Sequence, residues 1–157
     1  MDFNGLLDLI QTQSYDCLIL THPSIRVLTA ALGKVQQHFT YSTLNLGAEL
    51  SKELIHVAPG KRGIVAQEVF ERMLRESEPE TYFCTGIDLL FEPSLSIDPL
   101  MVFRRVARIK RIIVFWPGSF QEAVLAYANT GHHHYRTWRI SADWISSPVL
   151  HIYPLTN

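Results

Sequence analysis

Cysteine is scarce in this sequence. The 157 residues include only two cysteines, Cys17 and Cys84, which lie far apart in the chain and within apolar runs. A disulfide-stapled scaffold needs many more cysteines, and a structural zinc site needs several ligands at short spacings. We therefore expect two buried, reduced thiols and no metal site.

The sequence also lacks a strong charge of either sign and a long apolar run. Its formal net charge is −1, so no field of the whole protein recruits nucleic acid or an anionic membrane. No apolar run reaches the roughly 18 residues of a membrane span. The start of the chain, Met1–Gly5, has no basic residue of the kind that opens a secretory signal. We expect a cytoplasmic protein with no membrane partner.

Enough apolar residues remain to build one core. Hydrophobic residues make up 47% of the chain, which suits one domain over residues 1–157, with the part after about residue 119 least defined by pattern. Short apolar runs predict strands over 16–21, 40–46, 82–85, 111–116, 123–127 and 149–153. Helical periodicity predicts helices over 3–13, 25–32, 47–57 and 64–75, and from Asp98–Pro99 onward.

The alternation of strands and helices predicts an α/β fold with a mainly parallel central sheet and helices on both faces. Two boundaries depend on glycine and proline. Gly33 predicts the end of the second helix, and Pro117–Gly118 predicts the end of the strongest strand. In such folds ligands bind at the carboxyl ends of the strands, so the turns at those ends are where a site is expected.

The turn after the first strand is the place for a phosphate-binding loop. Such a loop needs glycines that let the backbone wrap the anion, a lysine, and a hydroxyl for magnesium. Residues 21–29 contain no glycine and no lysine. Arg26 can contact an anion or simply lie in solvent at the start of a helix. The residues of this degenerate nucleotide pocket are Thr21, His22, Pro23, Ser24, Arg26 and Thr29.

The second half of a nucleotide site is an acid at the end of another buried strand. Thr85 stands at that point, and Asp88 follows three residues later. Asp88 can orient a water molecule or cap the turn before Leu89. We therefore expect no ATPase activity and no cofactor, with binding of ATP and Mg²⁺ as the alternative.

Several short segments share their order and spacing with a known family. They are Asn45–Ser51, Asp88–Leu95, Asp98–Leu100, Trp116–Gly118, Ala126–Ala128, Gly131–His132 and Tyr135–Arg136. Together they resemble BrxF, the small P-loop-containing protein family of type 3 BREX (bacteriophage exclusion) systems, over about residues 18–136.

The resemblance implies a P-loop NTPase-like three-layer sandwich and a role in bacterial defence against phage, alongside other BREX proteins. The phosphate loop of the family falls on Thr21–Thr29, and its Walker B acid falls on Thr85. The resemblance thus points to a member with degenerate Walker motifs. We expect a non-catalytic subunit that acts as an interaction scaffold.

A run of basic residues is the densest charge feature. If the run forms one helix, Arg104, Arg108 and Arg111 share a face and Arg105 lies beside them. Such a stripe can contact DNA phosphates weakly and without sequence specificity, or an acidic partner. The other interpretation is a solvated helix end whose cations offset the helix dipole.

Aromatic residues are frequent in the last third of the chain. Trp138 and Trp144, flanked by arginines and an aspartate, suit either a partner surface or the core. Residues 149–155 predict an edge strand, which would favour a homo-oligomer. The run His132–His134 is consecutive, so its side chains diverge, and we expect a polar loop there and no metal site.

Overall fold

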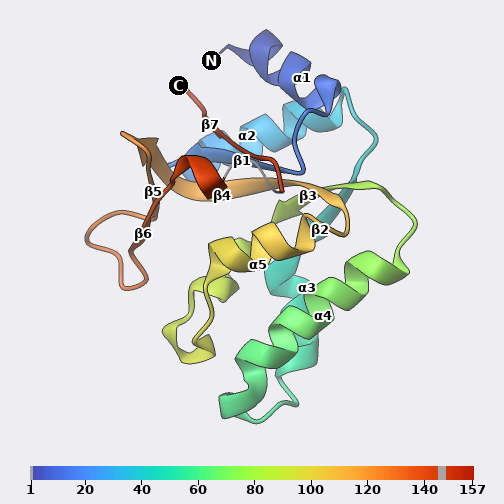
Figure 1. Ribbon diagram of the computed structural model, residues 1–157, viewed down its shortest axis with the longest axis vertical. Coiled ribbons are helices and arrows are strands. Elements are labelled where there is room, and N and C mark those ends of the chain that lie inside the picture. The colour runs from blue at the N-terminus through green and yellow to red at the C-terminus, as the bar shows by residue number, and fades with distance from the viewer. Residues whose placement is uncertain (1, 145–147) are drawn as a thin grey trace.

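A parallel sheet forms the centre of the molecule. The computed structural model describes residues 2–144 and 148–157 (Figure 1). The parallel strands pair in the order β2-β3-β4-β1-β7. Their bounds are β1 Cys17–His22, β2 Ser42–Asn45, β3 Thr81–Thr85, β4 Arg111–Gln121 and β7 Leu150–Pro154. Every residue of β1 is buried, because this strand lies inside the sheet and is covered on both faces.

Helices cover the sheet on both faces, as Figure 1 shows. One core, around Leu18, Leu20 and Ile113, joins the sheet to α1 (Phe3–Thr12) and α2 (Ile25–Gln36). The other core, around Ile19 and Trp116, lies under a second set of helices. These are α3 (Leu46–Leu54), α4 (Arg62–Glu76) and α5 (Pro99–Val106), with short 3-10 turns η1 Pro59–Lys61, η2 Ile87–Phe91 and η3 Pro93–Leu95. The expected α/β fold with a mostly parallel sheet and helices around it is confirmed.

The strongest strand does not end where proline and glycine predicted. β4 runs through Pro117 and Gly118 to Gln121, and there it changes partners. Up to Pro117 it pairs in parallel with β1, and from Gly118 it pairs antiparallel with β5 (Val124–Tyr127). β5 then pairs with β6 (Arg136–Arg139), a strand that the sequence pattern did not predict. We call Pro117–Arg139 the arm.

Two helix predictions were also wrong. α2 continues past Gly33 to Gln36, because Val35 extends its buried face and a glycine tolerates an exposed helical position. α5 begins at Pro99, and the Asp98 side chain caps it by accepting from the Met101 N–H at 3.3 Å, as expected. It ends at Val106, so the arginine stripe is not one helix face: Arg108 follows the helix and Arg111 begins β4.

The start of α1 lies near β7 (Figure 1), where the Tyr153 hydroxyl donates to the Asp2 carbonyl at 3.3 Å. Among the helices described, none combines the length and the apolar character that a membrane crossing requires.

Candidate functional site

A cavity opens at the carboxyl ends of β2 and β3, beside α2 and residues Phe115 and Pro117 of β4. Its volume is about 300 Å³, within the range of small-molecule sites. Three of the residues expected in a nucleotide pocket, Thr29, Thr85 and Asp88, line it together. The other lining residues are Ile25, Leu28, Leu32, Asn45, Gly86, Ile87, Phe115 and Pro117.

The floor of the cavity is built where β2 and β3 end side by side. Asn45 lies opposite Thr85 in the sheet, and its side chain caps α3 by accepting from the Ala48 N–H at 3.1 Å. Gly86 follows with a φ of 61°, and its carbonyl accepts from the Gly47 N–H at 2.8 Å. A Cβ at Gly86 would overlap the Asn45 side chain, so this turn requires glycine for both space and conformation.

Asp88 lies at the rim of the cavity and is held there by the arm. The Tyr127 hydroxyl, on β5, donates a hydrogen bond to Asp88 Oδ1. The Tyr127 ring stacks on Phe91 with centroids 3.5 Å apart. Burial, and then the hydrogen bond to Asp88, raise the pKa of Tyr127 well above its usual range, so the phenol stays protonated. The Asp88 side chain therefore serves to join η2 to β5.

Polar groups of the turn after β1 already form hydrogen bonds with one another and with other parts of the chain. The Ser24 N–H donates to Nδ1 of His22 at 2.9 Å, and Nε2 of His22 lies 2.8 Å from Oδ1 of Asn157. Pro23 has no N–H to offer. The carbonyl of Thr21 accepts from the Leu155 N–H at 2.9 Å, so the C-terminal segment lies along this turn.

The remaining expected residues of this turn do not form a phosphate site. The Thr21 hydroxyl is buried and has no hydrogen-bond partner within the described residues, and Thr21 does not line the cavity. The exposed side chain of Arg26 lies in the first turn of α2, outside the cavity lining. Of residues 21–29, only Ile25, Leu28 and Thr29 line the cavity.

The described lining of the cavity lacks the cationic side chains that usually neutralise a nucleotide phosphate. Its described lining holds one carboxylate and no lysine or arginine, so nothing there would neutralise a phosphate. Two threonines, an asparagine and apolar side chains make up most of the rest. This chemistry suits an uncharged or cationic group with an apolar body.

The two tryptophans that suited either a partner surface or the core lie mostly inward. Trp138 is buried in the core at 6% exposure, and its indole N–H donates to Asp98 Oδ1 at 3.0 Å. Trp144, in the 3-10 turn η4 (Ala142–Trp144), packs half-buried against the same core, and the Arg104 guanidinium lies over its ring at 5.0 Å. Trp138 therefore presents almost no surface to a partner.

The basic run divides into two groups. Arg111 is used internally: its Nε donates to the Tyr15 carbonyl at 2.9 Å, and its terminal nitrogens reach Gln13. Arg104, Arg105 and Arg108 line a second cavity, between α4 and the end of α5. The fold thus removes Arg111 from the predicted stripe and keeps the other three together.

The three consecutive histidines lie in the loop between β5 and β6. The His134 N–H donates to Nδ1 of His132 at 3.0 Å, and the His134 ring lies 3.7 Å from Glu92. Over residues 2–144 and 148–157, no cluster of histidine, cysteine, aspartate or glutamate has the geometry to hold a metal ion.

Several of the short segments singled out in the sequence for their order and spacing meet in space although they are far apart in the chain. Trp116 donates from its indole to the Ala126 carbonyl at 2.9 Å, and Phe91 packs edge-on against Trp116 at 5.1 Å. Arg136 lies 3.8 Å from Asp98. These motif residues therefore form the joint between the arm and the η2–α5 region.

Comparisons of the chain with known protein families, with curated proteins and with solved structures found no match. What the candidate site can do therefore follows from its own geometry.

Proposed function

We propose that this chain is a non-catalytic subunit of a bacterial anti-phage system of the BREX type. Its P-loop NTPase-like fold would serve as an interaction scaffold with a degenerate nucleotide site. The observation that carries the proposal is the contact network of the BrxF-like segments around Asp88, Phe91 and Trp116. Segments that meet in one network are the ones a shared fold would need to retain together.

The absence of catalysis in this proposal is supported by the turn after β1. The imidazole of His22 takes the Ser24 amide that a phosphate would need, and Asn157 lies against the same ring. A phosphate there would displace both of these contacts without gaining a lysine. Thr29 and Thr85 line the cavity together with Asp88, and no hydrogen bond found among the described residues joins either hydroxyl to that carboxylate.

The scaffold role is supported by the edges of the sheet. β7 pairs only with β1, and β6 pairs only with β5, so each strand leaves one edge of backbone donors and acceptors without a strand partner among the described residues. Such edges pair readily with another chain. We propose other BREX proteins, or a second copy of this chain, as the partner.

The experiment has two arms. The first measures phosphate release and thermal stability with ATP and Mg²⁺, and the second measures mass by light scattering, alone and after co-expression with other proteins of a BREX system. We expect no release, no thermal shift, and a mass above the 18.0 kDa of one chain. A stable monomer that co-purifies with none of those proteins would contradict the scaffold proposal.

A nucleotide-dependent switch is the second candidate, because Thr29, Thr85 and Asp88 line one cavity. It predicts a saturable thermal shift with ATP and Mg²⁺, since a ligand of the native state raises stability. The shift should disappear in Asp88→Asn and persist in Arg26→Ala, because Arg26 does not line the cavity. Absence of any shift would exclude this candidate.

A further inference from the structure

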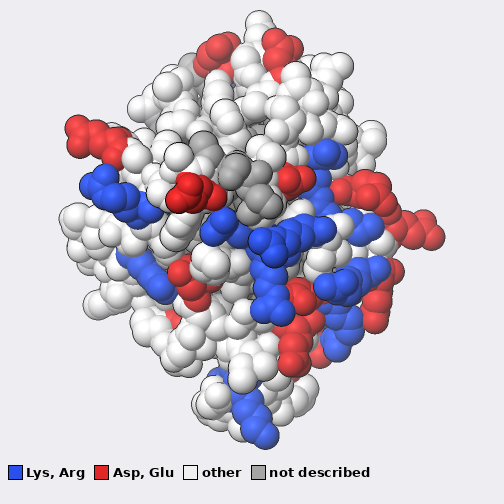
Figure 2. Space-filling view, in the orientation of Figure 1, with Lys and Arg blue, Asp and Glu red and all other residues white. Residues whose placement is uncertain are grey.

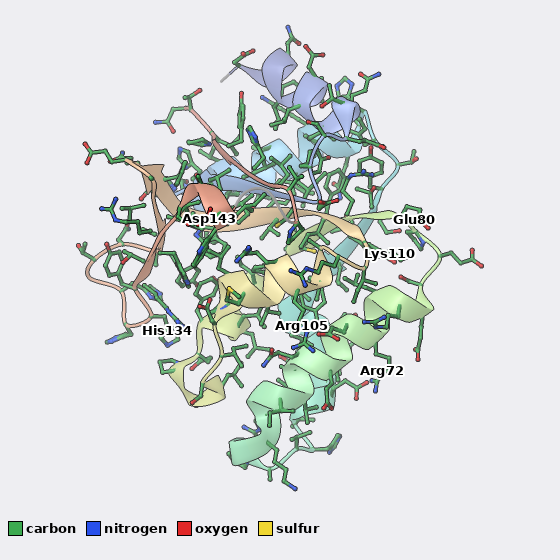
Figure 3. All side chains as sticks on the ribbon, viewed as in Figure 1. Arg72, Glu80, Arg105, Lys110, His134 and Asp143 are labelled. Atoms are coloured by element: carbon green, nitrogen blue, oxygen red, sulfur yellow. The ribbon has the colours of Figure 1, made fainter. Side chains whose placement is uncertain are left out.

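A second cavity lies on the opposite side of the sheet from α2, between α4 and the end of α5. Its volume is about 260 Å³, and it is lined by Gln67, Met101, Arg104, Arg105 and Arg108. Figure 2 shows Lys and Arg side chains gathered over α5 and α4, with acidic side chains around them. Arg105 extends from α5 toward α4, as Figure 3 shows.

The three guanidinium groups are not used to hold the end of α5. The last carbonyls of the helix already accept backbone N–H groups: Phe103 from Ala107 at 2.9 Å and Val106 from Ile109 at 2.9 Å. Because backbone N–H groups already satisfy these carbonyls, the guanidinium groups remain available to interact with a ligand.

Each arginine has a different environment. Arg105 forms an ion pair with Glu71 at 2.6 Å. The Arg104 guanidinium lies over the ring of Trp144, and its Nε is buried without a hydrogen-bond partner among the described residues. The exposed side chain of Arg108 has no ion pair in the described part of the chain. Glu71 pairs with Arg75 of α4 at 4.0 Å as well as with Arg105, so positive charge is in excess in the cavity wall.

We propose that Arg104, Arg105 and Arg108 form a binding site for phosphate groups. Guanidinium groups form paired, charge-assisted hydrogen bonds with phosphate oxygens, and Arg104 is already oriented by its contact with Trp144. The phosphates can belong to a nucleic-acid backbone or to a free small molecule. This site is separate from the cavity near Asp88 and does not depend on the scaffold role.

The test measures binding of a labelled DNA duplex by fluorescence anisotropy, and of pyrophosphate by calorimetry. Contact with three phosphates predicts that duplex affinity falls roughly 40-fold between about 50 and 200 mM salt. Arg108→Glu should weaken binding at least about tenfold without a loss of thermal stability, since Arg108 is exposed and has no ion pair among the described residues. Arg108→Lys should restore part of the affinity.

Lys34→Glu is the matched control. It makes the same change in net charge in the last turn of α2, on the other face of the sheet. Equal weakening by Lys34→Glu and Arg108→Glu would overturn the proposal, because the effect would then come from net charge alone.

The two ligands separate the sources of phosphate. Duplex binding that Arg108→Glu removes assigns the site to a nucleic-acid backbone, and pyrophosphate binding alone assigns it to a small phosphorylated molecule. Binding of neither, or tighter binding of a poly-glutamate peptide than of either, would overturn the proposal. Co-purification of the Arg108→Glu variant with BREX proteins is measured separately, so the scaffold proposal can fail or stand by itself.

Discussion

The parallel sheet and the arm are stabilised in different ways. In the parallel sheet, strands such as β1 are buried along their whole length, and their apolar side chains pack against helices on both faces. In the arm, β6 buries only Trp138 of its four residues, whereas β5 buries Leu125, Ala126 and Tyr127. The Tyr127 hydrogen bond to Asp88 and its stacking on Phe91 then join β5 to η2. Many apolar contacts on both faces hold the first region, whereas the second combines a few buried side chains with specific hydrogen bonds and ring contacts.

This difference predicts which single substitutions should destabilise only one of the two regions. A core of many apolar contacts loses stability as a whole, because its parts unfold together. An arm that depends on a few groups can open while the sheet remains folded, and local opening of this kind is measurable by hydrogen exchange. The following substitutions test whether the arm and the sheet separate in this way.

Replacing Trp116 should have the largest effect, because this residue joins the two regions. It is fully buried, packs against Phe91 and Trp138, and donates to the Ala126 carbonyl. Trp116→Ala should cost about 3–5 kcal/mol in the free energy of unfolding. Urea denaturation gives the total, and hydrogen exchange should show faster exchange of the β5 and β6 amides than of the β1 amides.

Ile113→Ala is the comparison, since Ile113 lies on the other face of β4, in the core under α1 and α2. It should cost about 2–5 kcal/mol and raise exchange in the sheet and the arm together. If Trp116→Ala also raised exchange evenly over both regions, the arm would not be a separate unit.

Gly118 should be the next most sensitive position. A Cβ there would overlap the carbonyl oxygen of Ala126 on the paired strand β5, and backbone atoms cannot move aside cheaply. Gly118→Ala should cost about 2–3 kcal/mol, measured by urea denaturation.

Gly33→Ala is the control for Gly118→Ala. Gly33 lies in α2 with open space around its Cα, so alanine should stabilise the protein by about 0.5–1 kcal/mol. A loss of stability at Gly33, or none at Gly118, would contradict the packing described for these positions.

The difference between the regions also explains what the sequence could predict. Apolar runs determine β1, β3 and the first part of β4, because a buried parallel strand needs apolar side chains on both faces. The β6 strand exposes three of its four residues, so it carries no such pattern. Pro117 predicted a strand end because proline lacks an N–H, whereas β4 uses that position to change partners.

The sequence likewise predicted some residues of the candidate site and missed others. The rule that ligands bind at the carboxyl ends of strands led to Thr85 and Asp88, which do line the cavity. Tyr127 was missed as a partner of Asp88 because 39 residues separate them. Only the path of the arm brings them together. The prediction that Arg111 belongs to the arginine stripe was wrong because the helix ends at Val106. The basic residues themselves do not encode that boundary.

Asp98 tests the link between the arm and α5. Its carboxylate caps α5, accepts from the Trp138 indole, and pairs with Arg136. Asp98→Ala removes all three contacts and should cost about 2 kcal/mol, measured as a fall in the urea midpoint. Asp98→Asn keeps an acceptor for the cap and the indole and should cost clearly less. Equal losses would mean that the charge pair with Arg136, and not the hydrogen bonds, attaches the arm.

Tyr127→Phe should have the smallest effect and the most informative pH dependence. At neutral pH it removes the hydrogen bond to Asp88 and keeps the stacked ring on Phe91, so it should cost about 1 kcal/mol. The pKa of Tyr127 is raised in the folded protein, chiefly by burial, so folding favours the protonated phenol. The stabilisation is therefore complete below the ordinary pKa of 10.0 and is lost as pH rises above it.

The difference in stability between the wild type and Tyr127→Phe should therefore shrink above about pH 10 and then change sign. Burial also raises the pKa of Cys84 to about 12, which destabilises both proteins at high pH. Because Cys84 is present in both, its effect cancels in the difference. Urea denaturation of the two proteins at pH 7 and at about pH 10.5 measures that difference. A constant difference over this range would mean that the Tyr127 phenol is not held protonated against Asp88.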